Sequence, residues 1–294
     1  DGLTKDGRAV PLQAEADLYE ALGLDYIEPE CREGLGEIEL AAAGKLPRLI
    51  EAGDIKGLFH VHTTASDGAH SLEEMASAVR AGGYDYLGLS DHSRSAVYAG
   101  GLSEIELAAQ GKEVARLNEL MSPFRIFHGV ESDILADGSL DYPDEVLAGL
   151  DFVIAAIHSH FNLAQERQTA RMLRAISHPA TTILAHPTGR LLLARKPYAL
   201  DMDKVVTACA QAGVVMEINA NPQRLDTDWR VAARAKEQGV RFAIGPDAHG
   251  LAGLADVAFG VNAARKARLQ AADVINCLKT EEAAEFLRAR KERA

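Results

Sequence analysis

From residue 53 onward, short apolar runs alternate with segments in which apolar residues recur at helical spacing. The short runs are rich in Val, Ile, Leu and Phe, which is typical of buried strands. We expect strands near residues 55–63, 84–90, 125–131, 151–158, 181–185, 214–219 and 240–246. Between and after them, the pattern predicts helices near residues 71–82, 103–120, 164–177, 201–212, 228–238 and 271–279.

This alternation of strands and helices predicts an α/β protein. Strands that follow one another through helices pair in parallel and connect by right-handed crossovers. A total of seven strands favours a closed barrel over an open sheet, although the spacing of strands alone leaves both architectures open.

The first 52 residues do not share this rhythm. A helical pattern over residues 12–22 ends at Gly23, and a second follows near residues 36–51. The turn at Gly53-Asp54 then leads into the first strand. We therefore predict an N-terminal segment over residues 1–52 and a main domain over residues 53–294.

Composition excludes several classes of protein. The chain has 294 residues of which 47% are hydrophobic, enough for a large packed core. No apolar run approaches the roughly 20 residues needed to cross a bilayer, so no membrane association is expected. Cys31, Cys209 and Cys277 are far apart and form no CxxC pair, which argues against a disulfide framework or a thiolate metal site. We expect a cytoplasmic protein.

The net charge of −12 argues against a protein that holds nucleic acid by bulk charge alone. More than half of this net charge lies in the first 52 residues, where twelve Asp and Glu and five Lys and Arg give −7. Carboxylates that bind cations would also be neutralised. A substrate that carries phosphate therefore remains open.

Histidines and carboxylates recur at the ends of the predicted strands. The candidates are His60, His62, Asp67, His92, Glu131, His158, His186, Asp247 and His249. Parallel strands deliver their carboxyl ends to one face, so these side chains are expected to converge. Each alone could be a core or surface residue, but the series of imidazoles and carboxylates predicts a centre of several divalent cations that hydrolyses its substrate.

Within this series, His60-Val61-His62 places two imidazoles two residues apart in a strand. Regular alternation would point both rings to the same side of the sheet. Asp91, next to His92, is expected either to orient that ring or to support the neighbouring backbone.

The remaining histidines and the nearby arginines receive other roles. His160 is expected at a loop or rim, and structural or solvent-facing positions are expected for His70, His128 and His178. Arg190 and Arg224 follow strand ends, where a guanidinium could hold substrate phosphate, whereas Arg195 and Lys196 read as surface cations. The chain has no GxSxG, Walker, HExxH or GxGxxG pattern, so nucleophilic serine or cysteine catalysis is not supported.

Seven segments in order resemble the motifs of the PHP (polymerase and histidinol phosphatase) domain. They are HVHTTASDG, LSDHSRS, GVESDI, AAIHSHF, AHPTGRLL, MEINANPQRLD and GPDAH. The longer strings AHPTGRLLLARKPY and EINANPQRLD are most similar to the version at the C-terminus of bacterial family X DNA polymerases. The segment AEADLYEALGLDYIEPECREG resembles the end of the polymerase body, so the chain is expected to be the C-terminal portion of a longer enzyme.

The resemblance implies a distorted seven-stranded (β/α) barrel with up to three divalent metal ions. Carried over, the three ligand sets are His60, His62, Glu131 and Asp247; Asp67, His92 and His249; and Glu131, His158 and His186. Manganese is the expected metal, with zinc or iron as alternatives. Leu58-Phe59 stands where the family usually has Asp-Leu, so one supporting carboxylate is expected to be missing.

The resemblance also implies a function. It is 3′ to 5′ exonucleolytic hydrolysis of DNA at single-stranded or gapped 3′ ends, in DNA repair, with the polymerase part of the same longer chain as partner. No polymerase palm is visible here. Two alternatives stay open: a small-molecule phosphatase of the histidinol phosphate type, and an inactive domain in which metals serve only stability.

Overall fold

Seven parallel strands form the centre of the molecule. The computed structural model describes residues 3–5, 7–9 and 11–292. The strands lie in sequence order in one sheet, as β3 (Gly57–Val61), β4 (Tyr86–Leu89), β5 (Arg125–Asp133), β6 (Phe152–Ala156), β7 (Thr181–Leu184), β8 (Val215–Asn219) and β9 (Phe242–Gly245). Just beyond β9, Ala248 bridges Val61 in parallel, and the His62 N–H donates to the Ala248 carbonyl over 2.9 Å. The sheet therefore closes, and the predicted barrel is confirmed.

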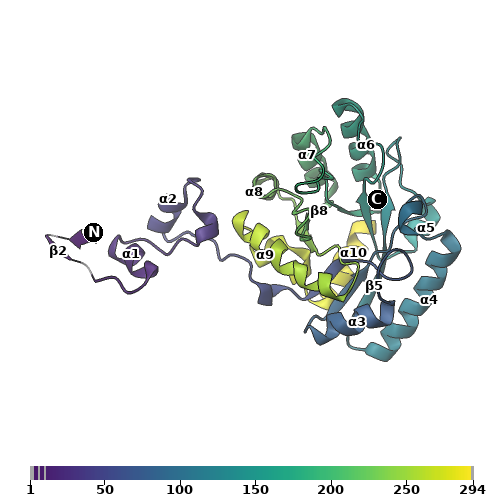
Figure 1. Cartoon of the computed structure of the whole chain (residues 1–294), viewed down its shortest axis with the longest axis horizontal. Helices are drawn as coiled ribbons and strands as arrows, with labels where there is room; N and C mark the ends of the chain where they lie inside the picture. Colours follow the sequence, from purple (N-terminus) through teal and green to yellow (C-terminus); the bar gives the residue numbers. More distant parts are fainter. Residues whose placement is uncertain (1–2, 6, 10, 293–294) are drawn as a thin grey trace.

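Helices surround the strands (Figure 1). They are α3 (Leu72–Ala81), α4 (Glu104–Met121), α5 (Asp144–Ala148), α6 (Gln165–Ser177), α7 (Met202–Ala212), α8 (Trp229–Glu237), α9 (Val257–Lys266) and α10 (Thr280–Glu292). Except in α10, their apolar faces pack on the outside of the sheet; on α3, for example, Met75 and Val79 are buried. Ser71 and Ser103 cap α3 and α4 by accepting from the N–H groups of Glu74 and Glu106.

Aromatic side chains fill the interior of the barrel near the amino-terminal ends of the strands. Phe59 lies 5.6 Å from Tyr86 and 5.2 Å from Phe152, measured between ring centroids. Ala283 and Leu287 of α10 belong to the same apolar cluster, so this helix covers the amino-terminal end of the barrel. The interior near the carboxyl ends of the strands is left for polar groups.

Close packing in this interior requires glycine at position 88. A Cβ atom there would lie 2.3 Å from Cδ1 of Phe59, inside van der Waals contact. We expect Gly88→Ala to lower the free energy of unfolding by about 1–3 kcal/mol, the usual cost of overpacking a core. Urea unfolding measures this, with Gly53→Ala as the control because a Cβ at Gly53 meets nothing within 4 Å. Equal stability of the two variants would contradict the prediction.

The sequence pattern misplaced the last helices. Residues 271–279 do not form the predicted helix but two short 3-10 turns, η5 (Ala271–Asp273) and η6 (Ile275–Cys277). The Asn276 side chain bonds the backbone of Ile244 and Gly57, so this segment crosses the strand ends instead of coiling. Helices α5, α9 and α10 were not predicted.

The N-terminal segment projects from the barrel on the side of α8 and α9 (Figure 1). It contains β1 (Thr4–Lys5), β2 (Arg8–Ala9), α1 (Glu15–Ala21), η1 (Pro29–Cys31), α2 (Glu37–Ala42) and η2 (Ala52–Asp54). The helix predicted near 36–51 is thus limited to α2. A left-handed Gly44 follows it, with a φ of 63°.

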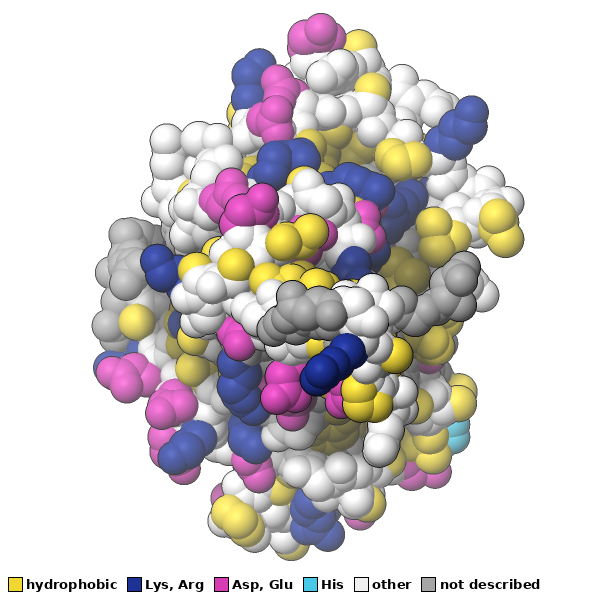
Figure 2. Space-filling model, turned by 90° about the vertical axis from the view of Figure 1, so that its left-hand side faces the viewer, with side chains coloured by type: hydrophobic (Ala, Val, Ile, Leu, Met, Phe, Trp, Pro, Cys, Tyr) yellow, Lys and Arg dark blue, Asp and Glu magenta, His cyan; other side chains and the backbone are white. Residues whose placement is uncertain are grey.

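Ion pairs attach this segment to α9 and the residues after it. Arg265 pairs with Glu30, Lys266 with Glu33, and Arg268 with Glu37. Basic and acidic side chains intermingle on this face of the molecule (Figure 2). The domain boundary near residue 52 stays a prediction. Among the described residues, no helix is both long and apolar enough to span a bilayer.

Candidate metal centre

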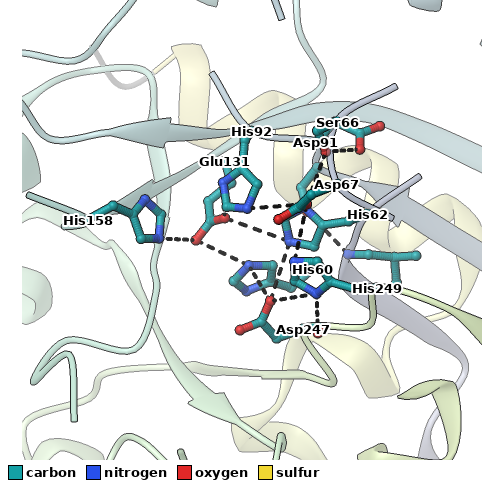
Figure 3. Close-up of polar contacts among 12 residues, drawn as sticks. His60, His62, Ser66, Asp67, Asp91, His92, Glu131, His158, Asp247 and His249 are labelled. Carbon is teal, nitrogen blue, oxygen red and sulfur yellow. Dashed lines mark hydrogen bonds and ion pairs between the residues drawn. The ribbon is translucent and has the colours of Figure 1, made fainter. Parts of the chain in front are cut away.

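The nine predicted ligands come together at the carboxyl ends of the strands. All of them except His186 are labelled in Figure 3. They arise from β3 (His60), the loop after it (His62 and Asp67), β5 (Glu131), and the segments that follow β4 (His92), β6 (His158), β7 (His186) and β9 (Asp247 and His249). Most are buried, whereas the side chains of Asp67 and His249 are 33% and 38% exposed. The cluster therefore opens to solvent on the side of these two residues.

Glu131 occupies the middle of the cluster. Its Oε1 atom lies 3.0 Å from His186 Nε2 and 3.3 Å from Nε2 of both His60 and His158. The Oε2 atom lies 3.0 Å from His92 Nδ1. One carboxylate is thus shared between imidazoles from four different strand ends, the position expected of a ligand that bridges cations.

The two aspartates of the cluster contact histidines on either side of Glu131. Asp247 Oδ1 lies 3.5 Å from His60 Nε2 and 3.4 Å from His62 Nε2. Asp67 Oδ1 lies 3.6 Å from His92 Nε2 and 3.3 Å from His249 Nε2. Each aspartate therefore anchors one end of the cluster.

Four groups of donor atoms are close enough to share a cation. They are His62, Asp67, His92 and His249; His60, Glu131 and His186; His60, His62 and Asp247; and His92, Glu131 and His158. These groups overlap the three ligand sets that the family resemblance implied but are not identical to them. The assignment of individual ligands to individual metals stays a prediction.

Buried polar atoms that lie near one another but make no hydrogen bond indicate that the cluster fits cations. His60 Nε2, both ring nitrogens of His62, His92 Nδ1, Glu131 Oε2 and His186 Nδ1 are buried and make no hydrogen bond within the described part of the chain. Leaving such groups unpaired costs about 1–3 kcal/mol each. Lone pairs on imidazole and carboxylate suit divalent transition metals, so bound cations would satisfy these atoms.

Three of the candidate ligands have left-handed backbones. The φ angles are 65° at His60, 23° at His186 and 51° at Asp247. Residues other than glycine adopt such angles at a cost, and they cluster at functional sites. At His60 the kink shifts the register of β3 against β4. Because of it, His60 and His62 both face the cluster, with ring centroids 5.3 Å apart.

Carboxylates control protonation in the cluster. Burial opposes protonation of His60, but Glu217, Asp247 and Glu131 outweigh it and hold its pKa well above the usual range. Burial likewise opposes ionisation of Glu131, yet His158, His60 and His92 hold its pKa well below the usual range. The carboxylates are therefore charged at neutral pH and available to cations, which would displace the protons on the imidazoles.

Two carboxylates that the sequence analysis did not single out support the histidines from behind. Glu217 Oε1 lies 2.5 Å from His60 Nδ1, and Glu217 Oε2 accepts from the His186 N–H over 2.8 Å. Asp133 Oδ1 lies 2.6 Å from His158 Nδ1. Both are buried, and a carboxylate inside an apolar strand such as VVMEIN was the signal for Glu217.

Glu217→Gln is expected to weaken metal binding about 10–100-fold, because a carboxylate behind a ligating imidazole fixes its orientation and raises its basicity. The measurement is metal titration of the chelated protein by calorimetry, with Glu237→Gln as the control, because Glu237 is exposed at the end of α8. Unchanged metal affinity in the Glu217→Gln protein would show that the charge of this carboxylate does not support the metal ligands.

Comparisons with known proteins agree with this geometry. The family model described as PHP domain matches residues 59–221, and the model described as DNA polymerase beta thumb matches residues 1–33. The chain belongs to the PHP domain family. The match confirms the predicted family, and the buried imidazoles and carboxylates of the cluster include four groups that could hold a metal ion.

Relatives of two kinds match this PHP domain. The whole chain, N-terminal segment included, is 41% identical over 282 residues to the "DNA polymerase/3′-5′ exonuclease PolX" of Bacillus subtilis (strain 168), covering 96% of this chain and 49% of the relative. It is 31% identical over 210 residues to a "probable phosphatase" of Caldanaerobacter subterraneus subsp. tengcongensis, covering 65% of this chain and 74% of the relative. The chain thus spans about half the length of the Bacillus protein.

A solved structure supports the fold. The putative histidinol phosphatase of Listeria monocytogenes superposes with a TM-score of 0.53 at 15% identity, covering 68% of this chain and 97% of that one. At this identity the likeness concerns only the barrel.

The departure from the family pattern at residues 58 and 59 falls in the apolar core of this PHP domain. Leu58 packs between strands and helices, and Phe59 packs inside the barrel. His60 nevertheless has a supporting carboxylate, because Glu217 provides it. Asp91 supports the backbone instead of the His92 ring: it accepts from the N–H and hydroxyl of Thr63 and from Ser66 Oγ.

The histidines that were not expected to be ligands lie outside the four donor groups. His128 contacts Gln110, and His178 contacts Asp144. His160 is exposed on a loop, and His70 is half-buried. None of them shares a donor group with the nine candidates in the described residues.

The two predicted phosphate-binding arginines differ in position. Arg224 Nε lies 3.1 Å from Asp247 Oδ2, so this guanidinium reaches the metal centre. Arg190 instead donates to the backbone carbonyls of Arg224 and Leu225 and lies 3.7 Å from Asp228 Oδ2. In this PHP domain Arg190 therefore braces the loop that presents Arg224.

Proposed function

We propose that this PHP domain hydrolyses phosphodiester bonds at DNA 3′ ends, removing nucleotides in the 3′ to 5′ direction as part of a longer family X polymerase. The observation that carries the proposal is the cluster of nine imidazole and carboxylate side chains at the barrel mouth with Arg224 at its edge. The name of the Bacillus relative, a polymerase and 3′-5′ exonuclease, supports DNA as the substrate class.

The residues of the cluster would hold up to three divalent cations, with manganese as the proposed metal. Bound there, such cations supply charge neutralisation at phosphorus and lower the pKa of water. Asp67 and His249 form the exposed edge, so the scissile phosphate would enter beside them. Arg224 would bind its non-bridging oxygens through the nitrogens that do not contact Asp247.

The reaction consumes one water per nucleotide. The water oxygen forms a bond to phosphorus, and the bond between phosphorus and the 3′ oxygen of the preceding nucleotide breaks. That oxygen takes up a proton, and the terminal nucleotide leaves as a 5′-monophosphate. Arg224 would balance the negative charge that grows on the phosphoryl oxygens during the step.

Incubation with substrates of different size tests this function. We expect the chain to shorten a 5′-labelled single-stranded or gapped DNA from its 3′ end when Mn²⁺ is present and to leave it intact in EDTA. Histidinol phosphate is the parallel substrate, because the barrel also matches probable phosphatases. Hydrolysis of histidinol phosphate without DNA cleavage would favour a small-molecule phosphatase, and bound metal without either activity would favour a structural domain.

A further inference from the structure

A basic pocket of about 690 Å³ lies between the loops that follow β6 and β7. His160, Phe161, Arg195, Lys196 and Tyr198 are among the residues that line it. No Asp or Glu belongs to the lining that the structure describes. In a protein with a net charge of −12, a pocket lined only by cationic, aromatic and neutral side chains selects for an anion.

Arg195 is held rigidly in this pocket. Its Nε donates to the Gly189 carbonyl over 2.8 Å, and its guanidinium carbon lies 4.2 Å from the centroid of the Phe161 ring. Phe161 in turn stacks on Tyr198, whose hydroxyl donates to the Pro187 carbonyl over 2.7 Å. Within the described residues, the two terminal nitrogens of Arg195 have no hydrogen-bond or ion-pair partner. The guanidinium is therefore fixed in place while its terminal nitrogens are available to an anion, and this preorganisation lowers the entropic cost of binding.

The pocket adjoins the metal centre. Its two loops begin at His158 and His186, whose ring centroids are 5.3 Å apart in the cluster. The loop that carries Arg195 also contacts the loop that carries Arg224, because the Leu192 N–H donates to the Gln223 carbonyl over 2.6 Å. A phosphate chain that reaches the metals past Arg224 therefore passes Arg195.

We propose that this pocket binds the backbone phosphate of the nucleotide that precedes the scissile bond, with Arg195 as its main ligand and Lys196 as a second cation. This inference rests on the proposed exonuclease function. Such an enzyme must hold the strand on the leaving-group side, where each nucleotide carries one phosphate. The exposed Lys196 contributes a point charge, and the Arg195 fork can bind two oxygens of one phosphate.

Two substrates that differ in this phosphate test the proposal. The pentanucleotide (dT)5 has a phosphate on the leaving side, whereas the p-nitrophenyl ester of thymidine 5′-monophosphate has the same scissile phosphate but none beyond it. We expect Arg195→Ala to raise KM for (dT)5 about tenfold and to leave kcat/KM for the ester unchanged. The slope of log KM against log salt for (dT)5 should become shallower by about 0.7, the value for one single-strand phosphate contact.

Arg80→Ala is the matched control, because Arg80 is an exposed cation in the last turn of α3, at the other end of the barrel. Arg195→Lys should raise KM for (dT)5 less than Arg195→Ala does, because lysine keeps the positive charge but lacks the paired nitrogens of the guanidinium. Unchanged KM for (dT)5, or an equal loss on both substrates, would overturn the pocket as a phosphate site. Failure of the unaltered chain to shorten (dT)5 while it cleaves the ester would instead overturn the proposed function.

Discussion

Replacing Glu131 with Gln should abolish hydrolysis, with a loss of at least about 10³-fold in kcat. The substitution keeps the shape of the side chain but removes a charge that imidazoles from four strand ends approach within 3.3 Å. An amide binds divalent cations less strongly than a carboxylate, and its N–H₂ group would face imidazole nitrogens. The measurement is the initial rate on 5′-labelled DNA, together with elemental analysis of the gel-filtered protein, which should contain fewer metal ions.

Glu145→Gln is the control for this experiment, because Glu145 is exposed in the first turn of α5. Circular dichroism distinguishes loss of function from loss of fold. A Glu131→Gln protein with full metal content and more than about a tenth of the original activity would show that Glu131 is not the shared ligand.

The chelated protein should lose stability as pH rises from 6.5 to about 10. Burial opposes protonation of His158, but Glu131 and Asp133 outweigh it and raise its pKa to about 10. For His249, Asp67 and Asp247 outweigh burial and raise the pKa to about 9. Folded-state pKa values above the unfolded value of about 6.5 contribute stability that is fully present below pH 6.5 and is lost as pH rises through them. We expect a fall of about 5 °C or more in Tm between pH 7 and 10.

His62 acts in the opposite direction. Burial, followed by the charge of His92, lowers the pKa of His62 to about 4. The unfolded chain therefore binds a proton that the folded protein does not, and the free energy of unfolding falls as pH falls from 6.5 toward 4. The chelated protein should therefore be most stable near pH 6.5. The control is the metal-loaded protein, in which cations replace the protons; its Tm should stay flat over pH 7 to 9. A chelated protein with equally flat Tm would contradict the prediction.

The sequence predicted the strands of the barrel and the place where the candidate ligands converge, but not all of the helices. All seven strands of the barrel were predicted, and the nine candidate ligands lie together as expected, because parallel strands place their carboxyl ends on one face. Their roles as metal ligands stay predictions. The helix predicted at 271–279 was wrong, since Asn276 bonds strand backbones that are distant in sequence. Helix α10 is mostly polar, and only contact with the barrel shows which of its residues are buried.

The chain alone determined the alternation of strands and helices, the class of ligand and the family, because these follow from residue types and their order. Only the tertiary structure decided how the ligands are grouped, that Glu217 and Asp133 stand behind His60 and His158, and that Arg190 braces a loop. The sequence had predicted that both histidines of the first pair point to one side, but only the structure showed that a left-handed backbone at His60 accompanies this orientation. Such features depend on distances between residues far apart in the chain, which periodicity does not encode.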